Sequence, residues 1–294
     1  MNTCIFVSDL HGHTEKYELL FREIIRQKPA FVFLGGDLLP HVHRSVRVQG
    51  REIPDFAREY LIPGFKRVSK QLGCNYPEVF VIMGNDDHRI CETAFREGEE
   101  RELWKYLNCS KAKFGPYHIY GYPFVPPTPF QIKDWEKFDV SRYVDPGCSD
   151  PSSGYRTADP GYDTEYATIA GDLERLAGSD SMEKAIFMMH SPPYGSFLDR
   201  AELDGKMVDY VPLDVHVGSI AVQRFIESRQ PYITLHGHVH ESSRLTGHWK
   251  QQFGRTISFT AAYDGPGLAL VRFMIDKPED NERYIVTSKG ISEG

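Results

Sequence analysis

The sequence predicts an α/β fold built on a parallel β-sheet, and two observations favour this class. Short runs of almost entirely apolar residues recur along the chain, as expected of strands buried on both faces of a sheet. The first two runs enclose a segment with an apolar stripe at helical spacing, which gives a strand, helix, strand unit. With 294 residues, 40% of them apolar, the chain can bury one large core. We therefore expect a single domain over residues 1–294.

The first unit runs from a strand at residues 4–7 to a second strand at residues 31–34. Between them, Thr14 can cap a helix that closes before Pro29. The apolar residues of this helix recur at intervals of three and four: Tyr17, Leu20, Phe21, Ile24 and Ile25. The crossover between these two parallel strands is expected to be right-handed.

The same pattern continues along the chain. Apolar runs predict three more buried strands, at residues 79–83, 185–189 and 231–236. Helical spacing precedes each of these strands, at residues 65–72, 166–177 and 222–229. Ser219 can cap the last helix. The tail alternates strand-like segments with turns, at residues 256–261, 268–275 and 283–287.

Residues 121–163 break this rhythm. Four prolines fall between residues 123 and 129, which excludes regular structure there, and residues 145–163 are rich in Asp, Pro, Gly and Ser. Long loops inside a compact domain are often functional, so we interpret this insertion as a loop or lid over a cleft. A surface excursion without a role is the alternative. Its aromatic residues, and those of the strand expected before it, can stack on a nucleobase or anchor the loop to the core: Tyr117, Tyr120, Tyr122, Phe124 and Phe130.

Polar residues follow five of the predicted strands at the point where each strand ends: Asp9, His11, Asp37, Asn85, His190, His238 and His240. Ligands of open α/β sheets bind beyond the carboxyl ends of the strands, so we expect these side chains to meet at one edge of one sheet. A single histidine after a strand is more often structural, and we expect His236 to pack in this way. Five coincident strand ends favour a common site.

The donor types predict a pair of metal ions at this site. Seven donors exceed what one four-coordinate ion needs, and a carboxylate can bridge two ions where an imidazole cannot. Asp37 is the natural bridge. Carboxylate, amide oxygen and imidazole without thiolate suit manganese, iron or zinc better than calcium. We expect manganese to serve best in vitro.

The five blocks Asp9-x-His11, Gly36-Asp37, Gly84-Asn85, His190 and Gly237-His238-x-His240 resemble the motifs of the calcineurin-like metallophosphoesterases. The resemblance implies a sandwich of two mixed sheets flanked by helices, with the chain after His240 completing the second sheet. It implies that one ion is held by Asp9, His11, Asp37 and His240. The other would be held by Asp37, Asn85, His190 and His238.

The resemblance implies a metal-dependent phosphohydrolase that cleaves a small phosphoester, mono- or diester, by attack of metal-bound hydroxide, with nucleotides among the candidate substrates. Three further segments are similar to the Icc-related predicted phosphoesterase branch: Pro126-Pro127-Thr128-Pro129, His190-Ser191-Pro192-Pro193 and Val217-Gly218-Ser219. A nuclease of the same family and a degenerate interaction scaffold are the alternatives.

One position departs from the family pattern. Many members carry His directly after the Asn, where it is held to protonate the leaving oxygen, whereas this chain carries Asp86. A carboxyl group beside two cations should be ionised at pH 7 and donate protons poorly. His88 is the first candidate to take this part, and other histidines on nearby loops are further candidates: His13, His41 and His43. Alternatively, Asp86 orients a metal-bound histidine.

The composition indicates which binding partners and which cellular compartment suit this sequence. The formal net charge of −7 argues against binding along nucleic acid, although Arg44, Arg47 and Arg51 can grip a distal phosphate or form a solvated face. Five scattered cysteines without a Cys-x-x-Cys pair indicate a reduced, cytoplasmic protein. No apolar run is long enough to span a membrane, and Met1 leads directly into a strand without a basic leader.

Overall fold

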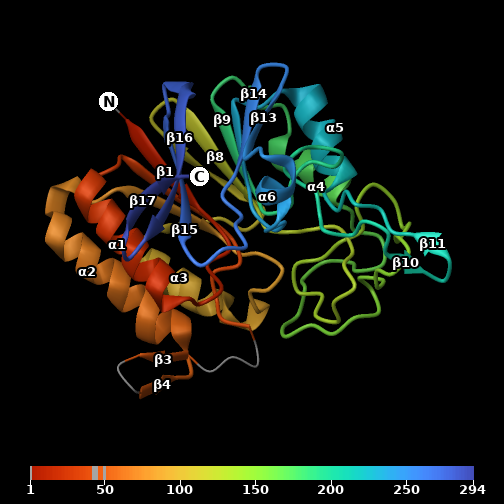
Figure 1. The fold of residues 1–294 in the computed structure, drawn as a ribbon, viewed down its shortest axis with the longest axis horizontal. Coiled ribbons are helices and arrows are strands. Elements are labelled where there is room, and N and C mark those ends of the chain that lie inside the picture. The colour runs from red at the N-terminus through yellow and green to blue at the C-terminus, as the bar shows by residue number, and fades with distance from the viewer. Residues whose placement is uncertain (1, 42–45, 49–50) are drawn as a thin grey trace.

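The computed structural model describes residues 2–41, 46–48 and 51–294. Two β-sheets pack face to face, and helices cover the outer face of each (Figure 1). The first sheet has seven strands in the order β17 (Gly290–Glu293), β16 (Lys277–Thr287), β15 (Leu268–Met274), β1 (Thr3–Val7), β2 (Phe31–Gly35), β5 (Glu78–Ile82) and β6 (Lys105–Tyr106).

The second sheet has six strands in the order β13 (Lys250–Phe253), β14 (Thr256–Thr260), β12 (Ile233–His236), β9 (Ala185–Met189), β8 (Tyr117–Tyr122) and β7 (Ser110–Phe114). Both sheets are mixed, since β1 pairs parallel with β2 but antiparallel with β15, and β14 pairs parallel with β12 but antiparallel with β13. The predicted α/β sandwich of two mixed sheets is therefore confirmed.

One expectation about the sheets was wrong. The five strands that end in polar residues do not share one sheet, because β1, β2 and β5 lie in the first sheet while β9 and β12 lie in the second. An apolar run is the same whichever sheet buries it, so the sequence pattern cannot distinguish the two. The candidate residues meet nevertheless, since both groups of strands end at the same edge of the sandwich.

Helices α1 (Thr14–Gln27), α2 (Ile62–Leu72) and α3 (Glu92–Glu100) flank the first sheet, and α4 (Ile169–Ala177) and α5 (Ile220–Arg229) flank the second (Figure 1). The short helix α6 (Ser242–Thr246) follows the last candidate loop. Ser219 caps α5 as expected, because its hydroxyl accepts a hydrogen bond from Val222 N. Thr14 does not cap α1: it is the first helical residue, and His13 occupies the cap position.

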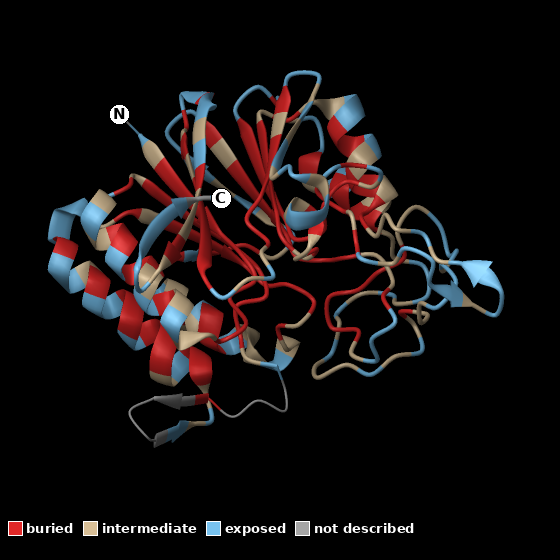
Figure 2. Cartoon of the chain, in the orientation of Figure 1, coloured by how far each residue is buried: buried red, intermediate tan, exposed pale blue. Residues whose placement is uncertain are grey.

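Strand residues alternate between two cores. Phe6, Phe33 and Phe80 belong to the core between the sheets together with Ile186 and Leu235 of the second sheet, and the rings of Phe33 and Phe80 stack. The intervening strand residues pack against the helices, and Figure 2 shows buried positions along both sheets and on the inner helix faces. None of the described helices is long and apolar enough to cross a membrane.

The insertion is irregular from the end of β8 to the start of α4, with isolated bridges such as Val125 to Glu136 in place of strands. It is nevertheless anchored by buried charged and aromatic residues: Lys133, Asp134, Trp135, Glu136 and Lys137. The helix predicted at 166–177 begins only at Ile169, because Thr168 caps it with a hydrogen bond from Gly171 N. Two hairpins, β3 (Val46–Val48) with β4 (Arg51–Ile53) and β10 (Met207–Val208) with β11 (Val211–Pro212), extend from the sandwich (Figure 1).

Candidate metal centre

The loops after five strands bring the seven candidate ligands together at one edge of the sandwich. They follow β1 (Asp9, His11), β2 (Asp37), β5 (Asn85), β9 (His190) and β12 (His238, His240). His236, by contrast, lies within β12, where Nδ1 contacts the carbonyl of Ser191 at 2.9 Å and Nε2 contacts Thr234 Oγ1 at 2.8 Å. His236 is therefore a packing residue.

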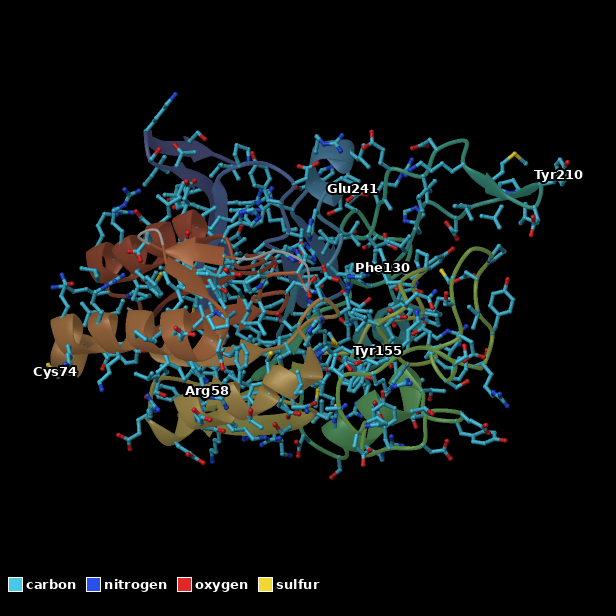
Figure 3. The ribbon with its side chains drawn as sticks, turned by 90° about the horizontal axis from the view of Figure 1, so that it is seen from below. Arg58, Cys74, Phe130, Tyr155, Tyr210 and Glu241 are labelled. Carbon is cyan, nitrogen blue, oxygen red and sulfur yellow. The ribbon has the colours of Figure 1, made fainter. Side chains whose placement is uncertain are left out.

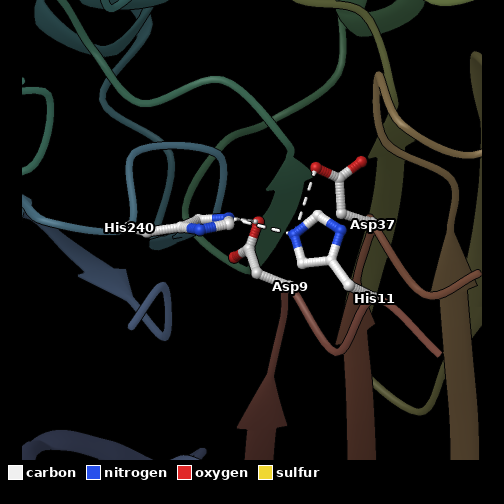
Figure 4. A group of neighbouring side chains, drawn as sticks. All are labelled: Asp9, His11, Asp37 and His240. Carbon is white, nitrogen blue, oxygen red and sulfur yellow. Dashed lines mark hydrogen bonds and ion pairs between the residues drawn. The ribbon is translucent and has the colours of Figure 1, made fainter. Parts of the chain in front are cut away.

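Four of these side chains form a compact group (Figure 4). His11 Nε2 lies 3.1 Å from His240 Nε2 and 3.9 Å from Asp37 Oδ2, and His240 Nε2 lies 3.3 Å from Asp9 Oδ1. One donor atom from each of the four residues falls within 4.8 Å of the others. This set is the one that the family resemblance assigns to the first ion.

The remaining residues adjoin this group through Asp37. His190 Nε2 lies 3.3 Å from Asp37 Oδ2, and its ring centroid is 5.4 Å from that of His238. His238 Nδ1 lies 2.7 Å from Asn85 Oδ1. Asp37 therefore touches both groups, which is the position a bridging carboxylate needs.

Unsatisfied nitrogens indicate that the site fits metal ions. His190 is fully buried, and Nδ1 contacts the Gly35 carbonyl oxygen at 2.8 Å. Nε2 lies near Asp37 Oδ2 but makes no hydrogen bond to any of the described residues. A buried polar atom without a partner is costly, and a metal ion would satisfy it. With Nδ1 donating to Gly35, Nε2 faces Asp37 and is the nitrogen left to bind an ion, as in metal sites where a carbonyl fixes the orientation of the histidine ring.

The backbone is strained at four of the seven ligand positions. Asp9, His11, Asp37 and His238 all have positive φ, at 58°, 44°, 53° and 73°. Such conformations are uncommon for residues other than glycine and cluster at functional sites. Hydrogen bonds hold the loops in place, since Asp9 N donates to the Gly36 carbonyl at 3.0 Å and His11 N donates to the Asp37 carbonyl at 2.8 Å.

Charge interactions divide the ligands into ionised and neutral groups. Burial opposes the charge of Asp9, but the hydrogen bond and charge of His240 outweigh it and lower the pKa of Asp9 to about 2. Burial likewise opposes the charge of His190, but Asp37 raises its pKa to about 10. Burial lowers the pKa values of His11 and His238 to about 4, so both are neutral at pH 7 and ready to bind a metal ion.

We expect metal binding to release the proton of His190. Because the pKa of His190 is raised to about 10 in the metal-free chain, this ring is protonated at pH 7, and an ion that binds Nε2 must displace that proton. The affinity for Mn²⁺ should therefore rise with pH between 7 and 9, by roughly tenfold per unit for one proton. Calorimetric titration in buffers of different ionisation enthalpy measures the proton release.

His216→Ala provides the control for this titration, because His216 pairs with Asp199 at 2.8 Å and belongs to neither ligand group. This variant should release the same number of protons as the wild type. An affinity that stays constant from pH 7 to 9 would show that His190 is already neutral or does not bind the ion.

Asp86 stands beside the first group. Its backbone N donates to Asp37 Oδ1 at 2.8 Å, and Oδ2 lies 3.2 Å from His41 Nδ1 and 3.6 Å from His11 Nδ1. Burial and the charge of Asp37 raise the pKa of Asp86 to about 7 in the metal-free chain. Asp86 is therefore expected to be fully ionised at pH 7, as the sequence predicts, only when the two cations are bound. The contact with His11 suits a residue that orients a metal ligand.

The histidines considered as proton donors lie at two different pockets beside the candidate site. His88 and His41 line a pocket of about 610 Å³ together with Asn85 and Asp86, whereas His13 lines a second pocket of about 560 Å³. The His41 ring stacks on that of His11, with centroids 4.7 Å apart. Two residues of the predicted loop, His43 and Arg44, lie outside the described residues, as do the side chains of Arg47 and Arg51.

Sequence reasoning missed Asp87, which holds the site's backbone. Its carboxylate is fully buried and accepts hydrogen bonds from Leu38 N at 2.9 Å, Leu39 N at 2.7 Å and Gly84 N at 3.0 Å. It therefore ties the loop after β2 to the loop after β5. The paired carboxylates after Asn85 were the available signal, since two adjacent acids in an apolar setting need partners.

The fold and this cluster define a class of two-sheet α/β proteins with a candidate His/Asp metal site. The sequence matches the family model of the calcineurin-like phosphoesterases over residues 3–242, and the chain belongs to this family. A search of curated proteins gives no match.

Several solved structures share the fold. The TT1561 protein of Thermus thermophilus has a TM-score of 0.54 at 13% identity, covering 96% of this chain and 97% of that chain. A dimetal phosphatase from Danio rerio has a TM-score of 0.51 at 11% identity, covering 99% of this chain and 96% of that chain. A third crystal structure has a TM-score of 0.57 at 15% identity, covering 99% and 98% of the two chains. At these identities the likeness shows the fold alone.

Proposed function

We propose that this protein is a dinuclear metal-dependent phosphohydrolase that cleaves a small phosphoester. The observation that carries the proposal is the convergence of seven oxygen and nitrogen donors from five loops, with Asp37 touching both groups. Two divalent ions, manganese, iron or zinc, would be held there. When bound, such a pair activates water for in-line attack and offsets the charge that gathers on phosphorus.

The chain's own residues prepare the site for this chemistry. The Gly35 carbonyl fixes the ring of His190, and His238 N donates to Asp9 Oδ1 at 3.0 Å, so ligands from different loops are held before any ion arrives. Ser8 Oγ also donates to Asp9 Oδ2. Preorganised ligands cost little reorganisation during reaction. No serine or cysteine nucleophile is required.

The purified protein supplemented with Mn²⁺ is expected to hydrolyse bis-p-nitrophenyl phosphate or p-nitrophenyl phosphate, and a chelator should abolish this activity. Metal analysis measures the ions bound per chain. Absence of any transition ion, with both aryl phosphates untouched across several metals, would favour an interaction scaffold. Release of acid-soluble nucleotides from DNA or RNA would favour a nuclease, which the net charge of −7 opposes.

His88 is proposed to donate a proton to the leaving oxygen. Asp86 is proposed to serve the same catalytic step by orienting His11. Both His88 and Asp86 line the pocket beside Asn85. His41 is the second candidate, because it lies 3.2 Å from Asp86 and lines the same pocket. If neither histidine donates efficiently, rates will depend steeply on the pKa of the leaving group.

Replacement of the two histidines distinguishes these candidates. Loss of a general acid costs about 10²–10⁴-fold, so the variant lacking the donor should lose that much toward an alkyl ester but little toward a p-nitrophenyl ester. We expect this for His88→Ala, with His41→Ala as the comparison. If each variant loses activity equally toward the alkyl ester and the p-nitrophenyl ester, neither histidine is the general acid.

The proposed setting is the cytoplasm, with a small phosphorylated molecule as substrate and neither nucleic acid nor a membrane as partner. The five cysteines support a reducing compartment, because all are free in the structure.

A further inference from the structure

Two pockets flank the candidate metal centre. The first adjoins Asn85 of the second ligand group, and the second adjoins Asp9, His11 and His240 of the first group. His41 lines both pockets, so they lie on two sides of this residue beside the cluster. A phosphate held between the two ions would therefore have room for one substituent on each side.

The outer wall of the first pocket comes from the insertion, at Pro129, Phe130, Gln131 and Ile132. Tyr117, Tyr120, Tyr122 and Phe124 are at most 2% exposed, whereas Phe130 is 56% exposed, as are Tyr143 and Tyr155 at 67% and 65%. Of these three exposed rings, Phe130 is the one that lines the first pocket. The four buried rings anchor the sheet and the insertion, whereas Phe130 presents an exposed ring to the first pocket. In Figure 3 it lies toward the middle of the molecule, away from Tyr210 at the hairpin tip.

This wall is rigidly built in the structure. Lys133 Nζ donates to the Thr128 carbonyl at 2.8 Å and pairs with Glu136 at 2.6 Å, and both side chains are at most 1% exposed. Trp135 Nε1 donates to the Asp87 carbonyl at 2.6 Å, which ties the insertion to the loop that carries Asn85. These contacts hold the backbone that carries Phe130 beside the ligand loop, since Phe130 N also donates to Thr128 Oγ1 at 3.1 Å, and a preformed pocket binds at low entropic cost.

The second pocket has a different character. Lys16, His13, Glu15 and Asp264 line it together with Tyr263 and the two residues that follow Asp264. These side chains present charges and hydrogen-bonding groups, which suit a polar substituent such as a sugar. The first pocket instead offers an exposed ring, a proline and Ile132, with the Gln131 amide at the edge. A flat aromatic group with a polar edge suits this set.

We infer that the substrate is a phosphodiester with a nucleobase or similar aromatic ring stacked on Phe130 and a second, polar substituent in the pocket beside Lys16. This inference rests on the proposed phosphohydrolase function and specifies its substrate class. A monoester would fill only one of the two pockets. Stacking on an aromatic side chain is tolerant of base identity, so Phe130 selects for an aromatic ring and not for one base.

Calorimetry on the manganese-loaded protein tests the aromatic site without requiring turnover. The probes are adenosine 5′-monophosphate and ribose 5-phosphate, which differ only in the base. The wild type should bind the nucleotide at least about tenfold more tightly. Phe130→Ala should remove most of this difference, and Phe130→Trp should retain it. Phe197→Ala is the matched control, because Phe197 is 47% exposed but lines neither pocket, and it should leave the difference unchanged.

Hydrolysis assays run in parallel separate the two proposals. The wild type should have a higher kcat/KM for bis-p-nitrophenyl phosphate than for p-nitrophenyl phosphate. Equal affinity for the two probes, or a difference that survives Phe130→Ala, would overturn the aromatic site even if hydrolysis is robust. A higher kcat/KM for p-nitrophenyl phosphate would overturn the inference that the substrate is a phosphodiester. Absence of hydrolysis with both esters would instead contradict the phosphohydrolase itself.

Discussion

Replacement of Asp37 with alanine is expected to abolish metal-dependent hydrolysis, with a loss of at least about a thousandfold in kcat/KM. Asp37 Oδ2 lies 3.3 Å from His190 Nε2 and 3.9 Å from His11 Nε2, so this carboxylate contacts both ligand groups. Its removal takes away the shared ligand. The number of manganese ions bound per chain should fall together with the rate. Both quantities are measured on the same preparation, by metal analysis and by release of p-nitrophenol.

Asp180→Ala is the matched control for this loss. Asp180 is a carboxylate that pairs with Lys111 on the second sheet and lines neither pocket, so its removal should leave metal content and rate unchanged. Circular dichroism checks that both variants fold. If Asp37→Ala binds the full complement of manganese and keeps its rate, the two ligand groups do not share this residue and the dinuclear proposal fails.

The strand ends could be predicted from the sequence because burial on both faces leaves a continuous apolar run that stops where the strand meets solvent. Thus Phe33 and Leu34 mark β2, and Asp37 follows within three residues. The pairing of strands into two sheets could not be predicted in this way. Ile186 and Phe6 are equally apolar, although they belong to different sheets that face each other.

The buried contacts of the insertion could not be predicted from the sequence either. Lys133 and Glu136 look like solvent-exposed residues in the sequence, but their ion pair is buried and holds the pocket wall. Such burial depends on partners brought together by the fold. The same is true of His41, whose contacts with His11 and Asp86 depend on the path of the chain from β2 to this residue. Spacing along the chain carries no signal for these contacts.

Gly84→Ala is expected to cost at least about a hundredfold in metal-dependent activity although it adds only one methyl group. A Cβ at this position would lie 2.3 Å from Asp37 Oδ1 and 2.7 Å from His190 Cε1, far closer than van der Waals contact. Both are side chains proposed to bind metal, so the methyl group must displace one of them. Displacement by about 1 Å is enough to cost a large factor in rate. Metal titration should show weaker binding in this variant.

Gly171→Ala separates this effect from the general consequences of replacing a glycine. Gly171 lies in α4, where a Cβ would meet only side-chain atoms of Arg175 and Thr168 at 3.3 Å, and neither residue touches the candidate centre. This variant should keep full metal affinity, and alanine in a helix should hold or raise its melting temperature. If Gly84→Ala also keeps its metal affinity and rate, Asp37 and His190 can retreat from the methyl group without loss, and their close packing against Gly84 is not required for the metal centre.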